Sequence, residues 1–234
     1  MKETEILLQE TELFNVWREI TPNLSEDGLI DPVEYVKSDI KILFLLKEVN
    51  SDKGFNLKQF VNDGGRTQTW DNVSRWTHGI LNWQNDFSWL DDIEPIKNIA
   101  KRKELLKYVS VMNIKKTPGG HTTNIKKLIQ DSTLGKSFLE RQFRLYFDNA
   151  DLRPDFIIAC GGTTSRLFRS IVPIIKIDKW SVTKRGVLYY EYEKGKYFIE
   201  YAHPEARVAD NLLYYGLVDA VRELKLKNSN LTST

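Results

Sequence analysis

Three side chains suited to acid–base chemistry each stand at the end of an apolar segment of the chain. Glu48 follows the run Ile42–Leu46, Asn113 follows residues 108–112, and His203 follows residues 197–202. A carboxylate can activate water, an imidazole can move a proton, and a carboxamide offers both a donor and an acceptor. Together the three groups can act on a ring that bears carbonyl and N–H groups. Taken singly, each residue also has an ordinary structural explanation. Glu48 could be a solvated carboxylate, Asn113 a turn residue, and His203 an imidazole packed in the core.

The apolar segments before these residues predict the strands that must position them. Residues 42–46, 108–112, 156–159 and 197–202 are largely apolar, as expected of strands buried on both faces. Helical patterns occupy residues 3–20, 71–83, 95–106 and 134–149, the segment after Gly161-Gly162, and the chain from Glu205 onward. This alternation predicts an α/β fold of three layers, α/β/α, around a central, mostly parallel four-stranded sheet. Residues 54–70 look irregular, and residues 186–201 predict a hairpin.

Parallel sheets bind ligands beyond the carboxyl ends of their strands, which is where the three polar groups and Gly161-Gly162 stand. The 234 residues contain no linker, so we expect a single domain over residues 1–226. Within it, residues 1–39 form an acidic N-terminal helical extension, and residues 227–234 form a frayed polar tail.

The small net charge of +2 hides a strong charge asymmetry. Residues 1–39 hold ten acidic and three basic side chains, a net charge of −7, whereas residues 97–144 hold twelve basic and three acidic ones, a net charge of +9. A basic sector of this kind suits a polyanionic partner. Charge alone is more simply explained by solvated helix faces.

Several classes of protein are excluded by composition and motif. No apolar run approaches the roughly 20 residues that span a membrane, and the start lacks the pattern of a signal peptide, so we expect a cytoplasmic protein without a membrane partner. Cys160 is the single cysteine and closes an apolar run, which indicates a buried thiol and excludes an intrachain disulfide or a four-cysteine metal site. The GKS at residues 135–137 lacks the first glycine of a P-loop, and no zinc-protease or zinc-deaminase motif is present.

Four sequence blocks in order resemble the uracil-DNA glycosylase superfamily, in particular the branch with a glutamate in its first motif. The blocks are ILFLLKEVNSD, YVSVMNIKKTPGG, PDFIIACGGTTSRLF and KRGVLYYEYEKGKYFIEYAHPEARV, and the resemblance spans roughly residues 40–224. It implies hydrolysis of the N-glycosidic bond of uracil or a related deaminated base in single- or double-stranded DNA, as in base-excision repair. Because a single cysteine cannot build an iron–sulfur site, we expect no metal or other cofactor, and we expect a monomer.

The resemblance also assigns roles to residues. Glu48 would activate water, Asn113 would read the uracil edge, and His203 would donate to a base carbonyl. An aromatic side chain among Phe55, Phe60 and Trp70 would stack on the base. Phosphates would be held by a larger set, namely Lys115, Lys116, Gly119, Gly120, Gly161, Gly162 and Arg207.

The first motif departs from the pattern of that family. That family usually has glycine, glutamate, a small residue, proline and glycine in this motif, whereas this chain has Lys47-Glu48-Val49-Asn50-Ser51. The chain also lacks the iron–sulfur cysteines of the similar branch. After His203-Pro204, Glu205 replaces the usual serine. Two alternatives therefore stay open. One is a non-catalytic nucleic-acid or nucleotide-binding protein of the same fold, and the other is an enzyme acting on a different glycosidic or nucleotide substrate.

Overall fold

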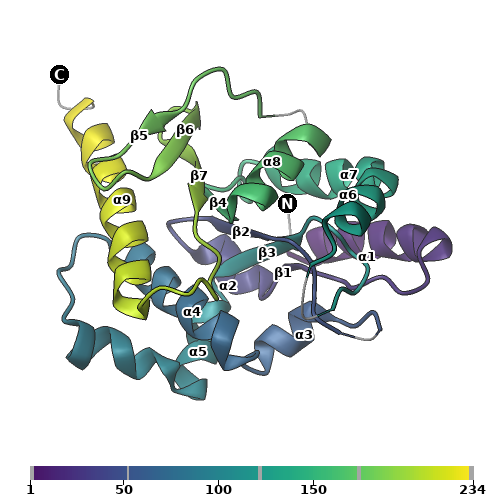
Figure 1. The fold of residues 1–234 in the computed structure, drawn as a ribbon, viewed down its shortest axis with the longest axis horizontal. Coiled ribbons are helices and arrows are strands. Elements are labelled where there is room, and N and C mark those ends of the chain that lie inside the picture. The colour runs from purple at the N-terminus through teal and green to yellow at the C-terminus, as the bar shows by residue number, and fades with distance from the viewer. Residues whose placement is uncertain (1–2, 52, 121–122, 173–174, 232–234) are drawn as a thin grey trace.

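The computed structural model describes residues 3–51, 53–120, 123–172 and 175–231 (Figure 1). In this part of the chain a seven-stranded mixed sheet has the order β1-β3-β2-β4-β7-β6-β5. Its strands are β1 (Gly28–Leu29), β2 (Ile42–Leu46), β3 (Val109–Asn113), β4 (Phe156–Cys160), β5 (Ser181–Val182), β6 (Leu188–Glu193) and β7 (Lys196–Tyr201). The helices are α1 (Glu3–Ile20), α2 (Pro32–Lys37), α3 (Leu57–Asn62), α4 (Thr67–Leu81), α5 (Ile99–Leu106), α6 (Ile125–Leu134), α7 (Lys136–Phe147), α8 (Gly162–Ile171) and α9 (Asp210–Leu231), with short helical turns η1 (Trp89–Ile93) and η2 (Glu94–Lys97) before α5.

The central strands are buried on both faces, because successive side chains of a strand point to opposite sides of the sheet. In β2, Phe44 belongs to one core, which also holds residues of α4 and α9, whereas Leu43 and Leu45 belong to a second core with residues of α1, α7 and α8. Figure 1 shows these two groups of helices on opposite sides of the sheet. The unbroken apolar pattern of β2 follows from this double coverage.

The predicted α/β class is confirmed, whereas the predicted four-stranded sheet is too small. The four predicted strands are present and mutually parallel, in the order β3-β2-β4-β7. The predicted hairpin is formed by β6 and β7. Two-residue β1 pairs antiparallel with β3 at one edge, and β5 pairs antiparallel with β6 at the other. Strands of two residues are too short to show an alternating pattern, which is why the sequence did not reveal them.

The acidic N-terminal segment packs into the second core. Phe14 and Trp17 of α1 are buried there, and β1 joins the sheet next to β3. The carboxylates of Glu10 and Asp27 are fully buried, which composition alone did not predict. Residues 3–39 therefore help to build the core, in addition to forming the expected helix.

Other elements differ from the predictions in their limits. The segment 54–70, predicted to be irregular, contains α3, whose first turn is capped by the Asn56 side chain accepting from the Gln59 amide. Helix α6 was not predicted at all, and the helix predicted from residue 134 is α7, which begins at Lys136. Helix α9 begins five residues later than Glu205 and continues to Leu231. The first five residues of the predicted frayed tail are thus helical, and the last three lie outside the described residues.

Across the described ranges, none of the helices has the length and apolar character that crossing a membrane requires.

Candidate functional site

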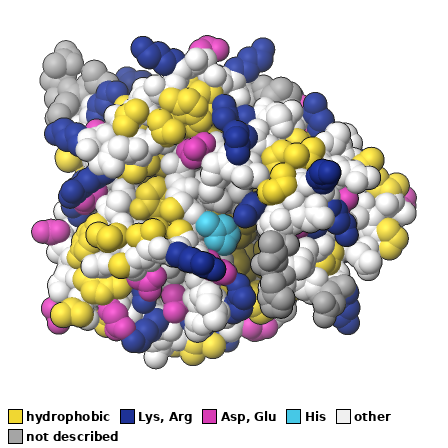
Figure 2. Space-filling model, viewed as in Figure 1, with side chains coloured by type: hydrophobic (Ala, Val, Ile, Leu, Met, Phe, Trp, Pro, Cys, Tyr) yellow, Lys and Arg dark blue, Asp and Glu magenta, His cyan; other side chains and the backbone are white. Residues whose placement is uncertain are grey.

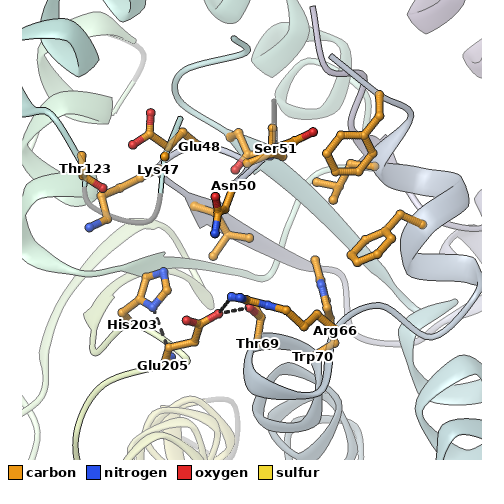
Figure 3. Close-up of a pocket in the computed structure, with 17 residues that line it drawn as sticks. Lys47, Glu48, Asn50, Ser51, Arg66, Thr69, Trp70, Thr123, His203 and Glu205 are labelled. Carbon is orange, nitrogen blue, oxygen red and sulfur yellow. Dashed lines mark hydrogen bonds and ion pairs between the residues drawn. The ribbon is translucent and has the colours of Figure 1, made fainter. Parts of the chain in front are cut away.

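A cavity of about 490 Å³ lies at the carboxyl ends of the parallel strands (Figure 3). Glu48 reaches it from the segment after β2, Asn113 from the last position of β3, and His203 from the segment after β7. The structure thus brings together the three residues that the sequence placed at strand ends. In the space-filling view, a histidine side chain lies in a hollow near the middle of this face, with Lys, Arg and acidic side chains beside it (Figure 2).

Glu48 is held by the neighbouring loop. Its Oε2 lies 2.5 Å from the Nζ of Lys115, which also donates to the Pro118 carbonyl at 2.8 Å. The Glu48 side chain is 8% exposed, and its Oε1 is buried and receives no hydrogen bond from the described residues. A Cβ on Gly119 would overlap the Glu48 carboxyl group, so only glycine allows this close approach. The loop therefore fixes one carboxylate oxygen, and the other is buried without a partner among the described residues.

Asn113 is oriented by a buried carboxylate from the N-terminal segment. Asp27 Oδ2 accepts from the Asn113 backbone N–H at 2.7 Å and from its side-chain Nδ2 at 3.4 Å. The same carboxylate is bound by Lys116 Nζ at 2.5 and 2.6 Å and by Gln142 Nε2 at 2.9 Å. Because the Nδ2 group faces Asp27, the amide cannot flip without placing its oxygen against a carboxylate. No described residue donates to Asn113 Oδ1, which stays available to a ligand.

His203 has a defined tautomer. Its Nδ1 accepts a hydrogen bond from the backbone N–H of Glu205 at 3.1 Å, so in the neutral ring the proton resides on Nε2. Burial lowers the pKa of the imidazole below its ordinary value. The positive charges of Lys47 and Arg66 lower this pKa further, and the negative charge of Glu205 partly offsets them. His203 is therefore a neutral imidazole at pH 7 that can donate from Nε2.

One wall of the cavity is closed by an ion pair between two loops. Arg66 and Thr69, at the start of α4, both donate to Glu205 Oε1 (Figure 3). Burial alone would raise the pKa of the Glu205 carboxyl, but the Thr69 hydrogen bond and the Arg66 charge outweigh it, and the pKa lies below its ordinary value. The negative charge of Glu205 is thus neutralised within the protein, and the segment 203–205 is tied to α4.

The aromatic residues predicted to contact the base all line the cavity, but they differ in exposure. Phe55 and Phe60 meet edge to face, with ring centroids 5.6 Å apart, and Phe60 is 39% exposed. Trp70 is 3% exposed and belongs to the core of α4 and α9. Trp70 is therefore a fixed wall, whereas Phe55 and Phe60 form the accessible aromatic end.

The predicted phosphate contacts are only partly compatible with the structure. Lys115 and Lys116, predicted to bind phosphate, are buried and paired with Glu48 and Asp27, so their side chains are engaged within the protein instead. Their positive charges suggested a surface role, whereas the fold uses them as partners of buried carboxylates. Gly119 packs against Glu48, and Gly120 lines the cavity.

The remaining predicted phosphate contacts lie at the same edge of the sheet. Gly161 and Gly162 begin α8 beyond the end of β4, and Arg207 is exposed in the segment after β7; none of the three lines the cavity. His121, which precedes α6, lies outside the described residues.

Four residues with evident effects on the site were missed by sequence reasoning: Asp27, Lys47, Arg66 and Thr69. Lys47 was visible as the residue that replaces the usual first glycine, but nothing in the sequence showed that its side chain enters the cavity.

Cys160 is buried as predicted, and burial raises the pKa of its thiol. Among the described residues, no three His, Cys, Asp or Glu side chains are close enough to hold a metal ion.

The chain matches no protein-family model, and no curated protein sequence matches it significantly.

Proposed function

We propose that this protein hydrolyses the N-glycosidic bond of uracil, or a closely related deaminated base, in DNA. The observation that carries the proposal is the meeting of Glu48, Asn113 and His203 in one cavity with an aromatic end. A flipped base would enter the cavity, lie against Phe55 or Phe60, and be read along its edge by Asn113. The strands β3 and β7 are three positions apart in the sheet, about 14 Å at ordinary strand spacing, which leaves room for a planar ring between Asn113 and His203.

The proposed reaction assigns a separate task to each group. The bond from C1′ of the sugar to N1 of the base breaks, and its electron pair leaves with the base. The Nε2–H of neutral His203 donates to a base carbonyl as negative charge develops there. Water adds to C1′ while the Glu48 carboxylate takes its proton, which finally returns to the base. The net reaction adds hydroxide to the sugar and a proton to the base.

Base selection would follow from the fixed amide of Asn113. Uracil presents a carbonyl oxygen beside an N–H, which matches an Nδ2 donor beside an Oδ1 acceptor. Cytosine presents an amino group beside an unprotonated nitrogen and requires the amide to be reversed. That reversal would set Asn113 Oδ1 against the Asp27 carboxylate. A mismatch of this kind leaves buried polar groups unpaired and supports strong discrimination.

DNA contacts would be made by exposed cations around the cavity, in place of the buried Lys115 and Lys116. Lys126 and Lys127 lie in the first turn of α6, Arg166 lies in α8, and Arg207 lies after β7, all exposed. If they meet phosphates, the logarithm of affinity falls with the logarithm of salt concentration by about 0.7 to 0.9 per neutralised phosphate. Replacing Lys126 and Lys127 with Gln should reduce that slope, whereas Lys101→Gln on α5 should not. A slope unchanged by the double replacement would contradict this placement.

The second candidate is a protein that binds a nucleic acid or nucleotide without hydrolysing it. It is favoured by one observation: the Glu48 carboxylate is bound by Lys115, so it is engaged within the protein rather than directed at a water. In that case the cavity would hold a base or nucleotide and release it unchanged.

The deciding experiment incubates the protein with single- and double-stranded oligonucleotides carrying uracil and other deaminated bases, and scores abasic sites by strand cleavage in alkali. We expect uracil release, with Glu48→Gln and His203→Ala each lowering single-turnover rates by roughly 10²–10⁴-fold. His78→Ala is the matched control, because His78 packs against Phe87 and does not line the cavity. Binding of uracil-containing DNA should change little in these variants, since most contacts are to phosphate.

Asn113→Asp adds a second test, since it replaces a donor and acceptor with acceptors alone and should impair uracil release. A wild-type protein that binds DNA yet releases no base from any substrate would refute the hydrolytic proposal and favour the binding protein.

A further inference from the structure

Lys47 lines the cavity as a cation that no carboxylate of the described residues neutralises. The other cations of the site are neutralised within the protein, Lys115 by Glu48, Arg66 by Glu205 and Lys116 by Asp27. Within the described part of the chain, no ion pair or side-chain hydrogen bond involves the Lys47 ammonium. A positive charge that has no counterion among the described residues, in a half-enclosed cavity, attracts an anionic ligand.

The Lys47 side chain is aimed at the His203 side of the cavity. Its backbone is fixed, because the Lys115 N–H donates to the Lys47 carbonyl at 2.9 Å and extends the pairing of β2 with β3. Figure 3 shows the Lys47 side chain between Thr123 and the imidazole of His203. The charge of Lys47 also contributes to lowering the pKa of His203, which indicates that the two groups interact. A cation and a neutral N–H donor thus border the same part of the cavity.

We infer that Lys47 and His203 form an anion site for a deprotonated pyrimidine base, and that Lys47 is a further catalytic residue which stabilises the departing base. The inference rests on the proposed function for the identity of the anion. When the bond from C1′ to N1 breaks, the electron pair leaves a base whose negative charge spreads onto its carbonyl oxygens. His203 supplies one hydrogen bond to that charge, and Lys47 supplies a full opposite charge beside it. A glycine at this position could not do so.

A binding experiment tests the anion site without requiring turnover. Barbiturate is a pyrimidine that is anionic at neutral pH, whereas uracil is neutral and similar in shape. We expect the wild-type protein to bind barbiturate at least about tenfold more tightly than uracil, measured by calorimetry at pH 7.5. Lys47→Met should abolish this preference, Lys47→Arg should retain most of it because the charge remains, and Lys101→Met, an exposed lysine of α5, should leave it unchanged.

A kinetic experiment then tests the catalytic role. Lys47→Met should lower the single-turnover release of uracil by about 10²-fold, the usual effect of losing one group that stabilises developing charge. The loss should be clearly smaller for 5-fluorouracil, because fluorine already stabilises the departing anion. Lys47→Arg should recover most of the rate.

The outcomes separate this inference from the proposed function. Loss of the barbiturate preference in Lys47→Met supports the anion site even if no oligonucleotide is hydrolysed, in which case only the hydrolytic proposal fails. Equal binding of barbiturate by the wild-type protein and Lys47→Met, or no preference for barbiturate in the wild type, overturns the inference even if uracil is excised. The inference is also overturned if Lys47→Met changes only the salt dependence of DNA binding, because Lys47 would then contact phosphate.

Discussion

Replacing Asp27 with Ala should cause a large loss of stability, since it leaves a buried ammonium without its counterion. The Asp27 carboxylate is fully buried and binds Lys116 at 2.5 and 2.6 Å and Gln142 at 2.9 Å. Removing one partner of a buried ion pair typically costs about 3–5 kcal/mol. With a urea m value of about 1–3 kcal/mol per M, the unfolding midpoint should fall by at least about 1 M.

The assay is urea unfolding followed by tryptophan fluorescence, repeated between pH 7 and pH 10. Burial lowers the pKa of Lys116 below its ordinary value, and the Asp27 charge opposes this. A lysine whose folded pKa is lowered binds fewer protons in the folded than in the unfolded state, so stability increases as the pH rises toward the ordinary lysine value. Without Asp27 the pKa of Lys116 is lowered further. The difference in unfolding free energy between the wild type and Asp27→Ala should therefore become smaller as the pH rises toward 10.

A double variant supplies the control for this reasoning. Asp27→Ala with Lys116→Met removes both charges and should be markedly more stable than Asp27→Ala alone. Glu205→Ala breaks the partly exposed pair with Arg66 and should cost at most about 1 kcal/mol. A deficit below about 1 kcal/mol for Asp27→Ala, or a double variant no more stable than the single one, would refute the assigned role of this pair.

Two further predictions concern the loop and the imidazole of the site. Gly119→Ala should destabilise the protein by about 1–3 kcal/mol, because the added Cβ would overlap the Glu48 carboxyl group. Gly120→Ala should not change stability, because open space surrounds that position. Similar thermal unfolding midpoints for the two variants would contradict the close packing of Gly119 against Glu48. His203 is held neutral by burial, so its contribution to stability is present above the ordinary histidine pKa of 6.5 and is lost as the pH falls below it. Thermal unfolding of His203→Gln between pH 5 and 7.5 should therefore depend less on pH than that of the wild type, and an identical dependence would argue against this shift.

The sequence by itself determined the central strands and the residues at their ends. Runs such as Ile42–Leu46 contain no polar residue, and such a run is stable only where both faces of a strand are covered. Parallel strands place their carboxyl ends at one edge, so the order of residues alone predicts that Glu48, Asn113 and His203 share a site. The structure places them around one cavity, and their catalytic roles stay a prediction.

The tertiary structure decided which charges face solvent. Lys115 and Lys116 have the local sequence of a basic loop, but they pair with carboxylates 67 and 89 positions away. Lys126 and Lys127 have a similar local sequence and are exposed. Burying a charge is costly unless a partner is present, and the position of that partner depends on how distant segments pack. The link from Asp27 to Asn113 arises in the same way, because β1 reaches the edge of the sheet beside β3 and brings Asp27 with it.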